Sequence, residues 1–369
     1  MVFNQKKIIM STKIGVLTGG GDCPGLNAVI RAVGKSASKL GWDTIGIMYG
    51  FEGLLDPVQF RVLDYKAMDG LLLKGGTILG TTNKGRFSAK TGTGEVNKIP
   101  EEILVAAKRN FEVLGLRALV VIGGDGSLTI AQQLFEVGVP LVAVPKTIDN
   151  DLEATVFTFG FDSAVACATD ALDRLHTTAE SHNRVMVMEV MGRYAGWISI
   201  YAGIAGGGDV ILIPEIPFNY DSICAKIFER EKQGKKFTLI VVAEGAHEKG
   251  NGLVIKDASE KDREVKLGGI AERVAKEIER RTGKETRTVV LGHLQRGGGP
   301  TSFDRVLCTM FGAKAVQLIA EEKYGYMVSY RPPETVAVKI TEAIGRLKKV
   351  PVDGDLVQTA RALGISFGD

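Results

Sequence analysis

Two aspartates and a threonine stand in a short stretch whose spacing could support proton transfer. Thr147, Asp149 and Asp151 alternate along the segment Pro145–Asp151, directly after an apolar run. Two carboxylates at this spacing can divide the work, because one takes a proton while the other orients a group or binds a metal. A hydroxyl that attacks a phosphoryl group needs such a base. Aspartates also favour plain turns, and we expect a turn and a catalytic loop together.

Two glycine-rich segments have the composition of phosphate-binding turns. The first, 19–25, contains Gly20, and the second consists of Gly123, Gly124, Asp125, Gly126 and Ser127. Glycine lets backbone N–H groups approach a phosphate, and the dipole of a following helix favours the anion. Asp125 would repel a phosphate unless a cation lay between them, which is a usual arrangement for Mg²⁺. The alternatives are a tight turn without a ligand for the first segment and a helix cap for Asp125.

Further polar residues stand at the ends or edges of apolar runs: Arg184, Arg193, Glu244, Arg287, His293 and Arg296. Guanidinium groups bind phosphates through paired hydrogen bonds. One such arginine alone would more often belong to a surface ion pair, but four of them near a histidine favour a phosphate site. The glutamate can accept hydrogen bonds from sugar hydroxyls or pair with a cation.

Short apolar runs alternate with longer helical patterns along most of the chain. The runs predict strands at Lys13–Thr18, Thr44–Met48, Ala118–Ile122, Leu141–Val144, Val185–Val190, Val210–Ile213, Thr238–Ala243 and Thr288–Leu291. The longer patterns predict helices at Leu26–Leu40, Glu101–Leu114, Leu128–Val137, Ser163–Thr177 and Ile270–Arg281. Continuous apolar strands are typical of parallel sheets covered on both faces, so we predict an α/β protein. Ligand sites in such folds lie beyond the carboxyl ends of the strands.

Composition limits the class of protein. The chain has 369 residues, 46 of them glycine, and a formal net charge of +3. This length predicts two domains, and the small charge argues against a nucleic-acid binder. The cysteines are too widely spaced for a metal knuckle or a redox pair, which favours a reducing compartment. No apolar run is long enough to span a membrane and no signal-peptide pattern is present, so we expect a cytoplasmic protein.

Five motifs, in this order along the chain, resemble those of the 6-phosphofructokinase family. They are Gly20-Gly21-Asp22 with Pro24-Gly25-Leu26-Asn27, Gly123–Ser127, Pro145–Asp151, Glu189–Arg193 and Gly292–Gly298. The resemblance extends from about Lys13 to about Ala343. It implies the phosphofructokinase fold of two Rossmann-like three-layer domains with mostly parallel sheets. The donor-binding domain would comprise 1–160 and 295–345, and the sugar-phosphate domain 161–294 and 346–369.

The resemblance also implies a role for each candidate residue. Asp149 would take the proton from the 1-hydroxyl of fructose 6-phosphate, Thr147 would position that hydroxyl, and Asp151 would support the charge arrangement. Asp125 would bind Mg²⁺. The donor phosphates would be held by Gly20, Gly123, Gly124, Asp125, Gly126, Ser127, Lys146, Asn83 and Lys84. The sugar phosphate would be held by Met191, Gly192, Arg193, Glu244, His293 and Arg296, with Arg193 near the transferred group.

The remaining two arginines imply an oligomer. Arg184 and Arg287 match residues that, in this family, reach the 6-phosphate from a neighbouring subunit. A homo-oligomer, either a dimer or a tetramer, would then be needed for activity.

The choice of phosphoryl donor depends on a few positions. Family members that use ATP usually have glycine where Gly126 stands, whereas pyrophosphate users usually carry an acidic residue that would crowd and repel the nucleotide. Lys146 is typical of pyrophosphate users, although some ATP users also have it. Asn83 replaces a donor-phosphate arginine of the bacterial form, and Lys84 or Arg86 can take its place. ATP is therefore the predicted donor, and a reversible, pyrophosphate-dependent enzyme is the alternative.

Two other functions remain open from the sequence. A lipid or NAD kinase shares a Gly-Gly-Asp-Gly loop, but the motif Gly292–Gly298 argues against it. A non-catalytic sugar-phosphate sensor on a kinase fold is opposed by the intact Asp125, Asp149 and Arg193. His176 stands where the bacterial form has an effector-site arginine, so the resemblance does not carry over that form's allosteric control.

Overall fold

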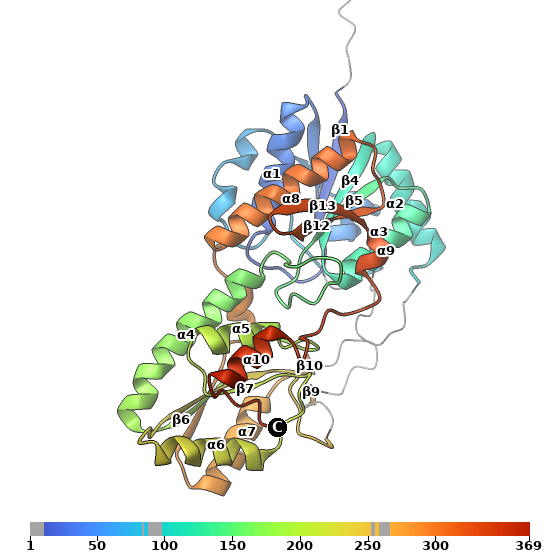
Figure 1. The fold of residues 1–369 in the computed structure, drawn as a ribbon. Helices are drawn as coiled ribbons and strands as arrows, with labels where there is room; N and C mark the ends of the chain where they lie inside the picture. Colours follow the sequence, from blue (N-terminus) through green and yellow to red (C-terminus); the bar gives the residue numbers. More distant parts are fainter. Residues whose placement is uncertain (1–10, 83–84, 88–97, 252–254, 258–265) are drawn as a thin grey trace, which may run out of the picture.

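The computed structural model describes residues 11–82, 85–87, 98–251, 255–257 and 266–369. These residues form two α/β units, one above the other in Figure 1, each built on its own sheet. The larger sheet has the strand order β13-β12-β5-β4-β1-β2-β3, and the smaller has the order β11-β6-β8-β7. The prediction of an α/β protein with mostly parallel sheets is confirmed.

The larger sheet joins strands from distant parts of the chain. Its parallel strands are β1 (Lys13–Thr18), β2 (Asp43–Ile47), β4 (Leu116–Gly123), β5 (Leu141–Pro145) and β12 (Tyr326–Arg331). The two edge strands are β3 (Phe60–Val62) and β13 (Glu334–Lys339), and each is antiparallel to its neighbour. Because β1, β4 and β5 are adjacent and parallel, the turns that follow them meet at one edge of the sheet.

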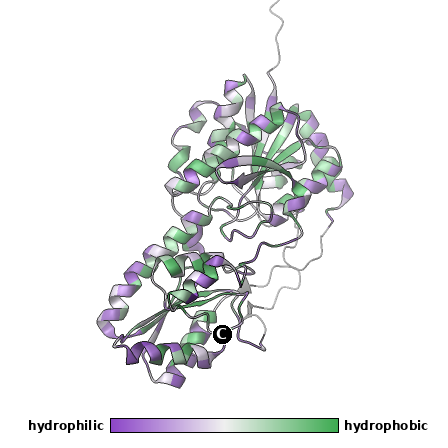
Figure 2. Ribbon diagram, viewed as in Figure 1, coloured by the Kyte–Doolittle hydropathy of each residue, from purple (hydrophilic) through white to green (hydrophobic). Residues whose placement is uncertain are grey.

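Alternation along the central strands explains why helices cover both faces of this sheet. Val16 and Val120 pack with one helix pair, whereas their neighbours Leu17 and Val121 point to the opposite face and pack with the other pair. The pairs are α1 (Leu26–Lys39) with α8 (Ser302–Ala320), and α2 (Glu101–Val113) with α3 (Asp125–Glu136). Figure 2 shows the apolar strands enclosed by helices with hydrophilic outer surfaces.

The smaller sheet is parallel throughout and is also covered on both faces. Its strands are β6 (Val185–Val190), β7 (Val210–Leu212), β8 (Thr238–Ala243) and β11 (Thr286–Val290). Met188 and Val190 of β6 pack on the side of α4 (Phe161–His182) and α5 (Trp197–Ala205). Val185 and Val187 point the other way, toward α6 (Tyr220–Lys232) and α7 (Ile270–Thr282).

The chain passes between the two units at 146–160, 291–301 and 345–354. An aromatic cluster lies at this junction. The ring centroid of Phe157 is 6.0 Å from that of Phe161, 6.4 Å from that of Tyr201 in α5 and 5.7 Å from that of Phe303 in α8. Phe157 therefore contacts elements of both units, which fixes the loop that carries it.

The remaining elements are short. They are α9 (Ile340–Ala343), α10 (Asp355–Ala362), β9 (Ile255–Asp257), β10 (Lys266–Leu267) and the 3₁₀ helices Gly50–Leu54, Lys66–Met68, Leu71–Leu73 and η4 (Gly292–Arg296). Ser366 forms a parallel bridge with Val210 of β7. The last residues of the chain thus pack against the smaller sheet, although β12 and β13 belong to the larger one.

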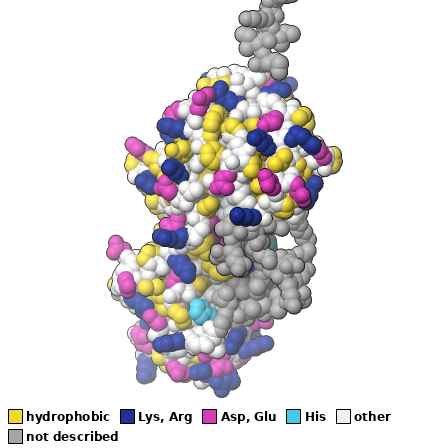
Figure 3. All heavy atoms as spheres, turned by 90° about the vertical axis from the view of Figure 1, so that its right-hand side faces the viewer, with side chains coloured by type: hydrophobic (Ala, Val, Ile, Leu, Met, Phe, Trp, Pro, Cys, Tyr) yellow, Lys and Arg dark blue, Asp and Glu magenta, His cyan; other side chains and the backbone are white. Residues whose placement is uncertain are grey.

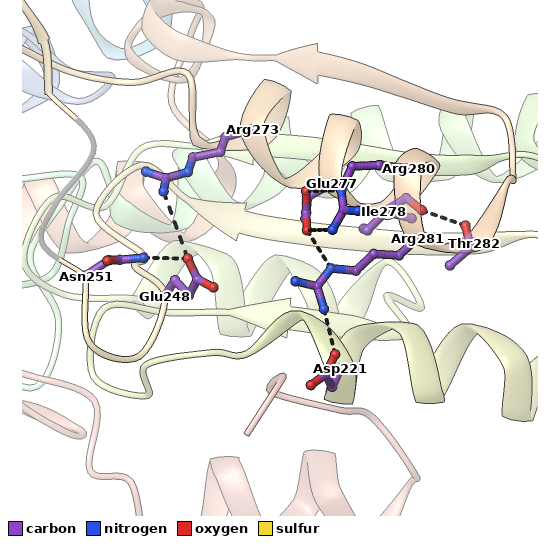
Figure 4. Close-up of polar contacts among 9 residues, drawn as sticks. All are labelled: Asp221, Glu248, Asn251, Arg273, Glu277, Ile278, Arg280, Arg281 and Thr282. Atoms are coloured by element: carbon purple, nitrogen blue, oxygen red, sulfur yellow. Dashed lines mark hydrogen bonds and ion pairs between the residues drawn. The ribbon is translucent and has the colours of Figure 1, made fainter.

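An ion-pair network covers the surface of α6 and α7 (Figure 4). Arg281 contacts Glu277 and Asp221, each at 2.6 Å, and Arg280 also contacts Glu277 at 2.6 Å. The hydrogen bonds from Arg280 and Arg281 lower the pKa of Glu277 to about 2. Because these side chains meet solvent, screening limits what the network contributes to stability.

The structure corrects the predicted start of one helix next to the candidate site. α3 begins at Asp125 and not at Leu128, and the N-cap position belongs to Gly124, with no side-chain bond. The interpretation of Asp125 as a helix cap is therefore wrong, and Gly126 lies in the first turn of α3. Strands β1, β6 and β8 have the predicted bounds.

Candidate active site

The loop after β5 is held by hydrogen bonds within itself. The Thr147 hydroxyl accepts a hydrogen bond from the Asp149 N–H at 3.1 Å, and the Thr158 hydroxyl donates to the Thr147 carbonyl at 2.7 Å. Asn150 has a left-handed φ of 50°, and its Oδ1 accepts from the Thr158 N–H at 3.1 Å. The expected turn is present. It leaves Oδ1 of Asp149 with no hydrogen-bond partner among the described residues.

A buried carboxylate anchors the far end of this loop. Asp304 of α8 accepts hydrogen bonds from the Gly160 N–H at 3.0 Å, the Ser163 N–H at 2.9 Å and the Ser163 hydroxyl at 2.6 Å. Burial raises the pKa of Asp304 to about 6 in spite of these bonds. Hydrogen bonds to a charged acceptor typically contribute about 1.5–3 kcal/mol each. Asp304 therefore fixes the start of α4 and with it the end of the loop.

Lys146 and Arg296 connect the first and last motifs to this loop. The Lys146 side chain is buried, and its ammonium donates a hydrogen bond to the Gly21 carbonyl at 2.6 Å. The Arg296 guanidinium lies so close to Gly21 that an added Cβ there would be 1.8 Å from Nη1. A side chain at this position would therefore have to displace the Arg296 guanidinium. The turn after β1, the loop after β5 and η4 thus meet.

The electrostatics of Asp149 reflect this convergence. Burial raises the pKa of Asp149 to about 7, the carboxylates of Asp151 and Glu244 add to the rise, and Arg296 and Lys146 oppose it. Burial likewise lowers the pKa of Lys146. A carboxyl group that titrates near neutral pH can accept a proton during a reaction and release it afterwards.

Asp149 and Asp151 form one acidic pair, and Asp125 and Asp151 form a second. Asp125 accepts a hydrogen bond from the backbone of Gly345, and its Oδ1 has no partner among the described residues. Burial raises the pKa of Asp125, and the Asp151 carboxylate adds to the rise. Burial also raises the pKa of Asp151, against the hydrogen bond from the Thr147 hydroxyl. Among the described residues no cluster of three or more acidic, histidine or cysteine side chains could hold a metal by itself.

Close packing explains the glycines of the two phosphate-type turns. An added Cβ on Gly19 would lie 2.6 Å from the Ser127 Oγ, and one on Gly123 would lie 2.3 Å from the Ser127 Cβ. Gly20 has a left-handed φ of 76°, and its added Cβ would lie 3.5 Å from the Lys146 ammonium. The turns after β1 and β4 therefore pack on each other around Ser127, next to Lys146.

The segment after β6 lies against η4 and the end of β8. The buried Gln295 of η4 accepts a hydrogen bond from the Met191 N–H at 2.8 Å. The Gly245 N–H donates to the Gly192 carbonyl at 3.1 Å, and an added Cβ on Gly245 would lie 1.8 Å from the Arg193 carbonyl oxygen. The candidate sugar-binding residues from these three segments are thus adjacent, and Glu244 precedes Gly245 in one of them.

Arg184 and Arg287 lie at the opposite end of the smaller sheet. Arg184 precedes β6 and Arg287 lies near the start of β11, whereas Met191 follows the end of β6. Both arginines pair with Glu285, Arg184 at 2.7 Å. His293 is exposed in η4. Within this chain, the structure therefore separates the four predicted arginines into two pairs.

Some predicted residues are not described, and some contacts were not predicted. Asn83 and Lys84 lie outside the described residues. No role was predicted from the sequence for Gln295, Asp304 and Lys348. Gln295 contacts the segment after β6, and Asp304 and Lys348 contact the loop after β5. Gln295 stands inside the motif Gly292–Gly298 and could have been found there. The other two stand in segments without a recognisable motif, and no sequence signal points to them.

The surface carries charges of both signs. On the face drawn in Figure 3, basic and acidic side chains are interspersed over both units. In the described parts of the chain, no helix combines the length and the apolar character that crossing a bilayer demands.

Comparisons with known proteins agree with the five motifs. The Phosphofructokinase family model matches residues 13–319. An ATP-dependent 6-phosphofructokinase of Chloroflexus aurantiacus is 54% identical over 357 residues, which cover 97% of this chain and 98% of that protein. The solved phosphofructokinase of Saccharomyces cerevisiae is 31% identical, with a TM-score of 0.77 over 90% of this chain and 45% of the yeast chain. A pyrophosphate-dependent phosphofructokinase of Marinobacter aquaeolei has a TM-score of 0.78 over 96% of this chain and 88% of its own, and at 21% identity it shows the fold alone. This chain belongs to the phosphofructokinase family.

Proposed function

We propose that this chain transfers a phosphoryl group from ATP to the 1-hydroxyl of fructose 6-phosphate, which yields fructose 1,6-bisphosphate and ADP. The observation that carries the proposal is Asp149, a carboxyl group beside two cations, with a pKa raised to about 7 and an unpartnered Oδ1 within the described part of the chain. Its carboxylate takes the hydroxyl proton while the sugar oxygen bonds to the γ-phosphorus. The bond from the γ-phosphorus to the β–γ bridging oxygen breaks, and ADP leaves.

The surrounding residues supply position and charge, which phosphoryl transfer needs more than covalent help. Thr147 positions the sugar hydroxyl, and Asp151 supports the charge arrangement around Asp149. Arg193 neutralises the transferred group. The donor phosphates are held by Gly20, Gly123, Gly124, Asp125, Gly126, Ser127 and Lys146, together with Asn83 and Lys84.

A magnesium ion fits the acidic pair. Asp125 has an unpartnered oxygen among the described residues and lies beside Asp151. Mg²⁺ is usually held by one or two carboxylates together with phosphate oxygens and water. When bound, it would neutralise charge on the donor phosphates, and Asp125 would be its protein ligand.

ATP as the donor is supported by two observations. Gly126, which has no side chain to crowd a nucleotide, lies in the first turn of α3, and relatives that match nearly the whole chain are named ATP-dependent 6-phosphofructokinase. Pyrophosphate is the second candidate donor, favoured by Lys146. The fold itself does not discriminate, because a pyrophosphate-dependent enzyme shares it.

The sugar phosphate is proposed to bind at a site shared by two copies of the chain. One copy contributes Met191, Gly192, Arg193, Glu244, His293 and Arg296. The other contributes Arg184 and Arg287. Within one chain these two arginines lie at the far end of the smaller sheet, away from the residues that the first copy contributes. We propose that the chain forms a homodimer or homotetramer and works in the cytoplasm. The proposed donor domain comprises 1–160 and 295–345, and the proposed sugar-phosphate domain comprises 161–294 and 346–369.

A donor comparison with product identification tests this function. The purified chain is assayed with fructose 6-phosphate and Mg²⁺, with ATP in one arm and pyrophosphate in the other, and the product is identified by its mass and by aldolase cleavage. We expect fructose 1,6-bisphosphate in the ATP arm, and only background from an Asp149→Asn variant. Turnover with pyrophosphate alone would reject ATP as the donor, and absence of product in both arms would reject the function.

A further inference from the structure

Lys348 lies where the chain crosses back from the larger unit to the smaller one, beyond residue 319, at which the family match ends. Its ammonium donates hydrogen bonds to Asn150 Oδ1 at 2.9 Å, to the Thr155 carbonyl at 3.0 Å and to the Val156 carbonyl at 2.9 Å. An ammonium group has three donors, so all of them are engaged by the loop that follows Asp149.

The backbone of the same segment is paired with that loop. The Lys348 N–H donates to the Asp151 carbonyl at 2.9 Å, and Leu347 forms an antiparallel bridge with Leu152. Three residues earlier, the backbone of Gly345 donates to the Asp125 carboxylate. The segment 345–348 therefore runs along both acidic pairs of the candidate site.

On its other side, the segment is tied to the smaller unit. The Lys348 carbonyl accepts a hydrogen bond from Nε1 of Trp197 at 2.9 Å, and the Lys348 ammonium lies 5.6 Å from the Trp197 ring centroid. Two residues later, the Val350 N–H donates to Glu215 Oε1 at 2.9 Å, and Glu215 also accepts from the Gly196 N–H at 3.1 Å. Trp197 and Gly196 stand at the start of α5. One residue thus joins the start of α5 to the loop of the candidate base.

We propose that Lys348 is a positioning residue that holds the loop 149–158 in the geometry presenting Asp149 and links this geometry to the smaller unit. The inference rests on the function proposed above. Asn150 has a left-handed φ, which asparagine tolerates better than most residues with a side chain, and the bond from the Lys348 ammonium to its Oδ1 holds it in that conformation. Burial lowers the pKa of Lys348 to about 8, while the carboxylates of Asp151 and Glu153 oppose the change, so the ammonium is mostly charged at neutral pH.

The loss of the ammonium affects turnover more than binding. In Lys348→Met the apolar stem remains, but Asn150 Oδ1 and the carbonyls of Thr155 and Val156 each lose the ammonium as a donor, and the loop gains freedom around Asp149. A misplacement of about 1 Å at a reacting group can lower the rate about 100-fold. We therefore expect kcat to fall between about 10- and 100-fold, with KM for the donor changed less than about threefold.

The test compares Lys348→Met, Lys348→Arg and Lys349→Met. Lys349 is the exposed neighbour, so its variant removes the same charge from the same segment without touching the loop. We expect a normal kcat from Lys349→Met and partial recovery from Lys348→Arg, which keeps a charged donor. Hydrogen exchange of the peptide 149–158 is measured on the same proteins. Only Lys348→Met is expected to exchange faster there, notably at the Thr158 N–H, which donates a hydrogen bond to Asn150 Oδ1.

The outcomes separate the two proposals. If kcat of Lys348→Met matches that of Lys349→Met, or if the loss lies in KM alone, Lys348 does not position the base. If the unsubstituted chain forms no fructose 1,6-bisphosphate, the proposed function fails. In that case the exchange of 149–158 decides the structural role, and equal exchange in both methionine variants would reject it.

Discussion

Two groups of charges in this molecule use the same residue types and have opposite properties. Asp149 and Glu277 each lie beside two basic side chains, yet the pKa of Asp149 is raised to about 7 and that of Glu277 is lowered to about 2. The arginines next to Glu277 donate directly to a carboxylate that water still reaches. Asp149 lies among converging loops, where burial and the carboxylates of Asp151 and Glu244 outweigh two cations. Direct hydrogen bonds to the carboxylate and the desolvation around it therefore set the pKa more than the number of basic neighbours does.

Removal of the candidate base is expected to have the largest effect. Asp149→Asn keeps the size and most of the polarity of the side chain but cannot accept the hydroxyl proton. We expect kcat for fructose 6-phosphate to fall about 10²–10⁴-fold while KM changes little. Steady-state kinetics measure this, and Glu277→Gln is the matched control with normal kcat. A kcat for Asp149→Asn within threefold of the unsubstituted chain would contradict the role of Asp149.

The second effect concerns the arginine pair at the far end of the smaller sheet. If Arg287 serves the site of another copy, Arg287→Ala should raise KM for fructose 6-phosphate about 10- to 100-fold and change kcat less. Co-refolded mixtures of Arg287→Ala and Asp149→Asn subunits should then regain turnover, because some sites combine an intact base from one chain with an intact arginine from the other. Mixtures with no more activity than the separate variants would indicate that each chain forms its site alone.

The pH dependence of stability should differ in sign between the two carboxylates. The pKa of Asp149 is raised from 3.8 to about 7, so the folded chain binds that proton more tightly than the unfolded chain does. The resulting stabilisation is complete below pH 3.8 and is lost as the pH rises toward 7. Asp149→Asn should consequently have a higher Tm than the unsubstituted chain at pH 8, by at least about 3 °C, and a similar Tm at pH 4.

Calorimetry at these two pH values checks this expectation, with Asp56→Asn as a control in an exposed ion pair. The same proteins give the pH profile of kcat, which should fall as the pH drops below about 7 because the base becomes protonated. A Tm of Asp149→Asn at pH 8 at or below that of the unsubstituted chain would show that burial does not penalise the charged form.

The smallest effect is expected at the surface network. The pKa of Glu277 is lowered from 4.5 to about 2, so its stabilisation is present above pH 4.5 and is lost as the pH falls through about 2. Glu277→Gln should lower Tm at pH 7 by less than about 3 °C, because exposed ion pairs contribute little. The difference should shrink in 1 M salt. A larger shift that persists in salt would mean that the network is not screened.

The sequence predicted those strands whose residues are mostly apolar, because apolar residues indicate burial. β1, β6 and β8 were predicted with their bounds because each is a mostly apolar run whose residues are buried on both faces. β12 and β13 were missed, since several of their side chains are partly exposed and the runs contain tyrosine, arginine and lysine. The start of α3 was misjudged because Asp125 and Gly126 are poor helix formers that the first turn tolerates.

The sequence predicted the site residues that stand in a motif. It did not predict residues that contact the site from a distant part of the sequence. Asp149, Lys146 and Arg296 stand in recognisable segments, and the structure brings them together. Lys348 and Asp304 reach the same loop from positions far along the chain. These contacts depend on how distant elements pack in the folded chain, and a local sequence pattern does not predict such packing. The separation of Arg184 and Arg287 from Arg193 and Arg296 could likewise not be read from strand ends alone.

The return of the chain to the larger sheet has a consequence for synthesis. β5 ends at Pro145, and the strand that covers its outer edge, β12, begins at Tyr326. At 5–20 residues per second the ribosome needs roughly 10 to 40 s to make the intervening segment. During that interval the smaller sheet can assemble on its own, while the open edge of β5 is accessible to other nascent chains. Chaperone demand in the cell should therefore be set by this waiting time and not by the stability of the finished protein.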